Sequence, residues 1–75
     1  MRTRRSTDAV VEVILDSILK GDIQPGDKLP SAQRLGAMIG TSFVSTREAL
    51  KGLETIGLIE ISHGRGMFLS RDPLS

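Results

Sequence analysis

The feature that most constrains this chain is a predicted amphipathic helix followed directly by a short hairpin with a basic tip. The helix is expected over residues 42–56, where Ser42 can cap the start and Gly57 can end it. Its inner face consists of apolar residues at helical spacing, Ala49, Leu50, Leu53 and Ile56. The hairpin is expected over residues 58–69, with a turn at 63–66. Because two strands alone are marginally stable in water, this hairpin must pack against helices.

Two further helices, separated from the last one by a glycine corner, are predicted upstream. The first is expected over residues 7–20, with an apolar stripe formed by Val10, Val11, Ile14, Leu15, Ile18 and Leu19. The second is expected over residues 31–39, and its apolar residues are Leu35, Met38 and Ile39. Gly40 can adopt the left-handed conformation that the turn of a helix-turn-helix needs, and Gly36 leaves room for the next helix to approach closely.

The extended segments complete the predicted fold. Alternation within the hairpin places Leu58 on one side of the strand and Ile59 and Ile61 on the other. Lys28-Leu29 is long enough for at most a minimal third strand beside the hairpin. The expected fold class is therefore mainly α with a small β-hairpin, a winged helix-turn-helix of three helices and a two-stranded wing.

Size and composition bound the class of protein. Seventy-five residues make one small domain of marginal stability. With no cysteine and only one histidine, the chain supports neither a zinc site nor a nucleophile with its base. No apolar run approaches the ~20 residues needed to span a bilayer. We therefore expect a cytoplasmic protein that is not an enzyme, needs no cofactor in this domain and does not bind a membrane.

Charge is unevenly distributed along the chain, although the net charge is only +1. Five of the nine acidic residues precede residue 28, whereas residues 28–71 contain six basic residues and three acidic ones. The basic surface is therefore expected on the last helix and the hairpin. A cationic helix followed by a basic hairpin is typical of domains whose helix enters a DNA groove while the wing contacts the backbone.

Several short motifs occur together at the spacing of one known family. They are Ile23-Gln24-Pro25-Gly26-Asp27-Lys28-Leu29-Pro30-Ser31, Gly40, Arg47-Glu48-Ala49-Leu50 with Leu53, Gly57-Leu58-Ile59, and Gly64-Arg65-Gly66. In combination they resemble the N-terminal DNA-binding domain of GntR-family bacterial transcription regulators over nearly the whole chain. The spacing of helix and wing is most similar to the branch related to the fatty-acid-responsive regulator.

The resemblance implies a set of DNA contacts. The positions that touch DNA in that branch correspond to Gln33, Ser42, Phe43, Val44, Ser45, Arg47, His63 and Gly64. Lys51 and Arg65 are cations on the same predicted surface and are expected to neutralise the DNA backbone. The recognition helix, about 42–56, is expected in the major groove, and the wing tip, 63–66, on the backbone or in the minor groove.

Some positions depart from the family pattern. Family members commonly have Glu-Arg in place of Ala32-Gln33 and arginine in place of Phe43, and Thr46 replaces an apolar residue expected to face the core. The operator of that branch therefore cannot be transferred to this chain. Phe43 can pack against thymine methyl groups in the major groove, or it can fold back toward Met38 at the corner between two helices.

Simpler interpretations stay open for the same residues. Arg47 can be a solvent-facing arginine paired with Glu48 or Glu54. The other candidates also have ordinary roles as helix caps, turn residues or solvated charges: Ser42, Ser45, Lys51, His63, Gly64 and Arg65. A winged helix can, moreover, serve as an adaptor for a protein or an RNA instead of binding DNA.

The resemblance also implies how a whole protein of this kind is organised. Residues 1–6 are expected to be a flexible tail, 7–70 the winged helix-turn-helix domain, and 71–75 the start of a linker. GntR-type regulators pair this domain with a C-terminal domain that binds a small-molecule effector and forms a homodimer, which suits a symmetric operator. No part of this sequence corresponds to that C-terminal domain, and we expect the chain to be one part of a longer protein.

Overall fold

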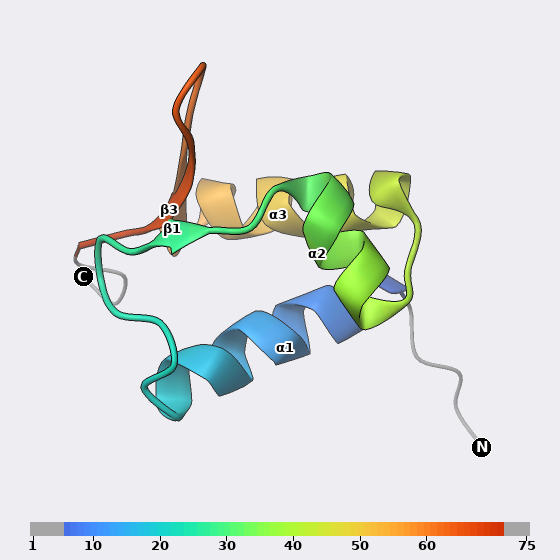
Figure 1. Cartoon of the computed structure of the whole chain (residues 1–75), viewed down its shortest axis with the longest axis horizontal. Coiled ribbons are helices and arrows are strands. Elements are labelled where there is room, and N and C mark those ends of the chain that lie inside the picture. Colours follow the sequence, from blue (N-terminus) through green and yellow to red (C-terminus); the bar gives the residue numbers. More distant parts are fainter. Residues whose placement is uncertain (1–5, 72–75) are drawn as a thin grey trace.

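The computed structural model describes residues 6–71, and within that range it has three helices and a small antiparallel sheet (Figure 1). The elements are α1 (Ser6–Leu19), β1 (Lys28–Leu29), α2 (Ala32–Ile39), α3 (Phe43–Thr55), β2 (Ile59–Ser62) and β3 (Gly66–Leu69). The strand order is β1-β3-β2. The predicted winged helix-turn-helix is therefore confirmed, and the two residues of β1 form a third strand. None of the helices within residues 6–71 is long and apolar enough to cross a membrane.

The ends of two helices differ from the prediction. α1 begins at Ser6, one residue inside the segment predicted as a tail. The rest of that segment and the predicted linker beyond Arg71 lie outside the described residues. α3 is helical only to Thr55, and Ile56 caps its C-terminus with φ −87° and ψ 2°.

Glycine forms the corner between α2 and α3, as predicted. Gly40 has φ 88° and ψ 30°, a left-handed conformation that is strained for a residue with a side chain. The carbonyl oxygen of Gly36 accepts hydrogen bonds from the amides of Gly40, at 2.8 Å, and Thr41, at 2.9 Å. The Gly36 carbonyl group thus closes the C-terminal end of α2 while the chain turns toward α3.

Gly36 also lets α3 approach α2 closely. A Cβ atom at residue 36 would lie 2.8 Å from the hydroxyl oxygen of Thr46 and 3.1 Å from the carbonyl oxygen of Thr41. Thr46 is fully buried at this contact, and its hydroxyl donates a hydrogen bond of 2.8 Å to the carbonyl oxygen of Ser42. The position expected to be apolar is therefore occupied by a threonine whose polar group is satisfied within its own helix.

The hydrophobic core receives side chains from every helix and strand. Its buried members are Val10, Ile14, Leu29, Leu35, Ala49, Leu50, Leu53, Leu58, Ile59, Met67 and Leu69. α1 packs on the inner face of α3, and the hairpin of β2 and β3 projects away from α1 beyond the helices (Figure 1). This arrangement leaves the outer face of α3 and the tip of the hairpin uncovered.

Four apolar side chains on the predicted helices are exposed instead of buried. Leu15 lies at the edge of the apolar stripe of α1 and is 41% exposed, while Leu19 ends that helix and is 85% exposed. Ile56 is 70% exposed, because α3 ends at Thr55 and its inner face does not continue past that residue. Met38 lies exposed on α2.

The start of β2 also differs from the predicted alternation. Leu58 precedes the strand and is buried together with Ile59. The Leu58 amide donates to the Leu53 carbonyl oxygen at 2.9 Å, and the Leu58 carbonyl oxygen accepts from the Ser70 amide at 3.0 Å. Ile61 is exposed although its partner Met67 in the central strand β3 is buried, because β2 lies at the edge of the sheet.

Candidate nucleic-acid interface

The outer face of α3 begins at a capped helix end. Ser42 has the extended conformation of an N-cap, and its hydroxyl oxygen accepts a hydrogen bond of 3.1 Å from the Ser45 amide. The capping role predicted for Ser42 is therefore confirmed. The amides of Phe43 and Val44 lie in the first turn, where a helix provides no carbonyl partner for them. Such a helix end carries partial positive charge and suits an anion.

The structure places six of the predicted site residues together on this side of α3. Ser42, Phe43, Val44, Arg47 and Lys51 are exposed, and Ser45 is half-buried. α1 covers the opposite side of α3 (Figure 1). The sequence pattern thus identified the uncovered face correctly.

Arg47 and Phe43 lie one helical turn apart and contact each other. The guanidinium carbon of Arg47 lies 5.7 Å from the centre of the Phe43 ring, within the range of a cation–π interaction. Among the described residues, no ion pair joins Arg47 to Glu48 or Glu54. Phe43 is 49% exposed, so it is not buried at the corner between α2 and α3.

A shallow groove runs along this face. It has a volume of about 240 Å³ and is lined by Phe43, Val44, Arg47, Glu48 and Lys51. Apolar side chains and cationic side chains therefore border the same depression. Such a surface can accept both an apolar group and the phosphates beside it.

The wing tip is a tight turn between β2 and β3. The Arg65 amide donates a hydrogen bond of 3.1 Å to the Ser62 carbonyl oxygen, and Gly64 has φ 80°. His63, Gly64 and Arg65 are all exposed. The tip therefore presents backbone groups at the far end of the projecting hairpin (Figure 1). Arg65 also lines a depression on the sheet, together with Glu60 and Phe68.

Gln33 belongs to another element, α2, and is exposed in its first turn. Ser31 caps this helix by accepting a hydrogen bond of 3.2 Å from the Arg34 amide. The exposed cations Arg34 and Lys28 were not among the predicted site residues. Lys28 lies beside the wing only because β1 pairs with β3, and local sequence carries little signal for that pairing.

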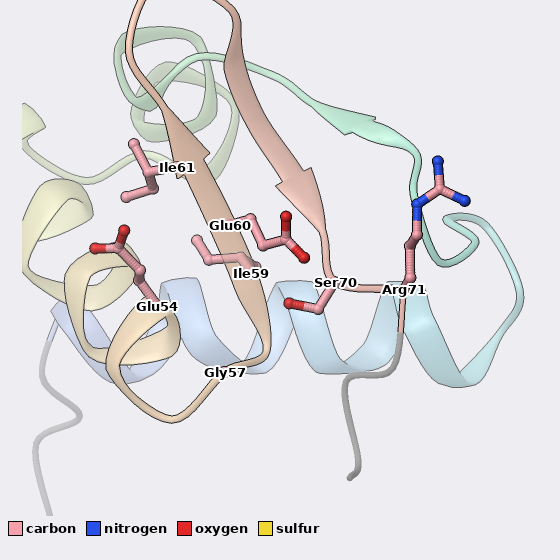
Figure 2. Close-up of a pocket in the computed structure, with 7 residues that line it drawn as sticks. All are labelled: Glu54, Gly57, Ile59, Glu60, Ile61, Ser70 and Arg71. Carbon is pink, nitrogen blue, oxygen red and sulfur yellow. The ribbon is translucent and has the colours of Figure 1, made fainter.

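A second, larger depression lies where the end of α3 meets the base of the wing (Figure 2). Its volume is about 580 Å³, and its lining residues are Glu54, Gly57, Ile59, Glu60, Ile61, Ser70 and Arg71. None of the predicted site residues belongs to it. Its two carboxylates outnumber its one cation, Arg71, whereas the groove on α3 has two cations and one carboxylate, Glu48, so the larger depression is the poorer candidate for nucleic acid.

Comparison with known proteins identifies relatives of this chain. Residues 6–69 match the family described as bacterial regulatory proteins, gntR family. The HTH-type transcriptional regulator Mce2R of Mycobacterium tuberculosis is 44% identical over 63 residues, which cover 83% of this chain and 26% of that protein. The HTH-type transcriptional repressor YtrA of Bacillus subtilis is 38% identical over 72 residues, covering 91% of this chain and 55% of that protein. The chain thus spans about a quarter of the first relative and about half of the second.

Solved structures show the same fold. A GntR family transcriptional regulator from Listeria monocytogenes has a TM-score of 0.88 and 25% identity, over 96% of this chain and 63% of that chain. The DNA-binding domain of AraR, in complex with its operator ORR3, has a TM-score of 0.85 and 29% identity, over 92% of this chain and 83% of that chain. The chain therefore belongs to the gntR family of bacterial regulatory proteins, and it has the winged-helix fold of that family's DNA-binding domains.

Proposed function

We propose that this chain binds double-stranded DNA in a sequence-specific way, as the operator-reading domain of a GntR-type transcription regulator. The observation that carries the proposal is the uncovered face of α3, where Arg47 and Lys51 border an apolar groove and no described carboxylate pairs with either cation. The similar fold of the AraR domain, which binds its operator, supports the proposal.

In the proposed complex, α3 enters the major groove. The planar fork of Arg47 can bind the O6 and N7 atoms of a guanine, and the adjacent Phe43 and Val44 can contact thymine methyl groups. The hydroxyl of Ser45 and the free amides at the start of α3 are placed for a phosphate. Lys51, one turn after Arg47, would neutralise the backbone at the side of the groove.

The wing and α2 extend this contact. His63, Gly64 and Arg65 project far enough to reach the DNA backbone or the minor groove next to the one that α3 occupies. Gln33 would contact the backbone or a base from the first turn of α2, with an amide where the family usually has arginine.

The organisation of the whole protein is part of the same proposal. A homodimer would place two such domains on a two-fold symmetric operator, and a small-molecule effector would bind in a separate domain. This proposal, like the placement in the fatty-acid-responsive branch and in the cytoplasm, is supported by the resemblance of the motifs. Because two linked domains bind far more tightly than one, we expect the 75-residue chain alone to be a monomer that binds DNA weakly.

The test starts with selection from a randomised DNA pool at low salt, followed by fluorescence anisotropy on the selected sequence and on a scrambled control. Arg47→Ala should weaken binding of the selected sequence by about 1–3 kcal/mol and relax discrimination at one base pair. Arg47→Lys keeps the charge but loses the fork, so it should lose discrimination while retaining most of its binding to scrambled DNA.

Two results would contradict the proposal. If the selection enriches no DNA sequence, the chain does not bind DNA in a sequence-specific way. If the chain binds RNA or a protein but not DNA, the adaptor role is favoured. Equal binding by the wild-type chain and Arg47→Ala at every sequence would remove Arg47 from the site.

A further inference from the structure

Lys28 lies on the outer face of the sheet, outside the helices. β1 pairs with β3 so that Lys28 is opposite Phe68, while Glu60 of β2 is opposite Phe68 from the other side. The phenylalanine therefore separates the lysine from the glutamate in one row across the sheet. Among the described residues, no carboxylate forms an ion pair with Lys28.

The side chain of Lys28 is directed toward the wing tip. A Cβ atom at residue 66 would lie 2.9 Å from Cε of Lys28 and 3.6 Å from its Nζ. Gly66 is two residues closer to the tip than Phe68, so the stem of Lys28 runs diagonally along the hairpin. A side chain at residue 66 would displace the end of Lys28 from this path, and Gly66 also has φ 113°, which favours glycine.

The ammonium group is thereby placed beside the tip. Gly66 is opposite Ser62 in the hairpin and follows Arg65 in the chain, so Lys28 and Arg65 put two cations on one projecting element. The apolar stem is laid along the backbone of the wing while the charge stays in water, which is the usual arrangement of a surface lysine. The charge is thus available to an anion that the wing approaches.

We propose that Lys28 is a DNA-backbone contact, which binds a phosphate next to the one contacted by the wing tip. This inference rests on the proposed DNA binding. A lysine ammonium is a compact point charge without the fork that recognises a base edge, and its place below the tip keeps it out of the groove. The third strand therefore adds a cation to the binding surface as well as an edge to the sheet.

The experiment compares Lys28→Gln with Lys20→Gln on the selected operator across a salt series. Glutamine keeps most of the stem of Lys28 and removes the charge. Lys20 is a matched control because it is also exposed, but it lies next to α1 and pairs with Asp16 at 2.9 Å. Lys28→Gln should reduce the slope of log K against log salt by about 0.9, the value for one phosphate contact, and Lys20→Gln should leave the slope unchanged.

The loss should be equal on operator and scrambled DNA, and Lys28→Arg should restore binding. Equal slopes for Lys28→Gln and Lys20→Gln would overturn the inference. If Arg47→Ala still weakens binding in the same assay, the proposed function is retained. A loss confined to the operator would overturn it as well, because it would mean that Lys28 reads a base. No salt-dependent binding of DNA by the wild-type chain would instead overturn the proposed function itself.

Discussion

Replacing Phe43 by alanine tests whether the start of α3 belongs to the core or to the binding surface. The Phe43 side chain is 49% exposed, so folding removes only part of it from water. Full burial of a phenylalanine contributes about 1.5–3 kcal/mol, and half of that is about 1 kcal/mol. This is an upper value, because the unfolded chain already shelters some of the ring. The contact with Arg47 adds about 0.5–1 kcal/mol, and the better helix propensity of alanine offsets about 0.5 kcal/mol.

We therefore expect Phe43→Ala to lower the free energy of unfolding by about 1 kcal/mol, or the Tm by roughly 4–8 °C in a domain this small. Urea and thermal unfolding followed by circular dichroism measure both quantities. Val44→Ala is the matched control, since Val44 is the neighbouring residue and is more exposed. It should change stability less than Phe43→Ala.

The same variant should bind thymine-containing half-sites with less preference, and Phe43→Arg should shift the preference toward guanine. A double-mutant cycle with Arg47→Ala should give a coupling energy of about 0.5–1 kcal/mol in stability. A loss of about 3–5 kcal/mol in Phe43→Ala, the range typical of a core aromatic, would instead mean that the ring is buried.

Four further substitutions test the packing and the surface charge. Gly36→Ala should destabilise the fold by about 1–3 kcal/mol in urea unfolding, since the new methyl group meets Thr46. Gly52→Ala is the control in another helix, where the new methyl group meets no atom, and it should stabilise the fold by about 0.5–1 kcal/mol. Equal effects of the two substitutions would contradict the close approach of α2 and α3. Thr46→Val should change the free energy of unfolding by less than about 1 kcal/mol, because the Ser42 carbonyl oxygen that accepts from the Thr46 hydroxyl also accepts from the Thr46 amide. A larger loss would show that the hydroxyl is needed. The hydrogen bond that the Lys20 ammonium donates to Asp16, together with the charge of that carboxylate, raises the pKa of Lys20, so Asp16→Asn should lower that pKa in an NMR titration. Because the pKa is raised, the contribution of this pair to stability is present below the unfolded-state pKa of lysine and is lost as the pH rises through the folded-state value.

The elements that could be predicted are those that local chemistry determines. Gly40 marks the corner because the turn needs a left-handed residue, and the structure has φ 88° there. The close packing of α2 and α3 at Gly36 could be predicted because the spacing between Gly36 and Gly40 places Gly36 on the side of α2 that faces α3. The cap at Ser42 follows from a hydroxyl that can bond the amide three residues on. In each case the cause lies within a few residues of its effect.

The features that could not be predicted depend on what lies opposite in space. Periodicity places Leu15 and Leu19 near the apolar stripe of α1, but it does not say where the neighbouring element ends. Alternation places Ile61 on the face of Ile59, but only the strand order shows that Ile61 lies on an edge strand, where it is exposed while its partner Met67 is buried. A minimal third strand at Lys28-Leu29 was expected, but its register, which places Lys28 opposite Phe68 about 40 residues along the chain, is not encoded by a local pattern.

The proposed binding residues and the core residues of this domain are separate sets. All ten predicted site residues lie on the surface, nine of them exposed and Ser45 half-buried, and none belongs to the buried core. Surface substitutions usually change stability by no more than about 0.5 kcal/mol. Gln33 and Phe43 can therefore differ from the family pattern without disturbing the packing of α1, α2 and α3. In a domain of marginal stability this separation matters, because the side chains that would read DNA can change while the small core that holds α3 and the wing in place stays the same.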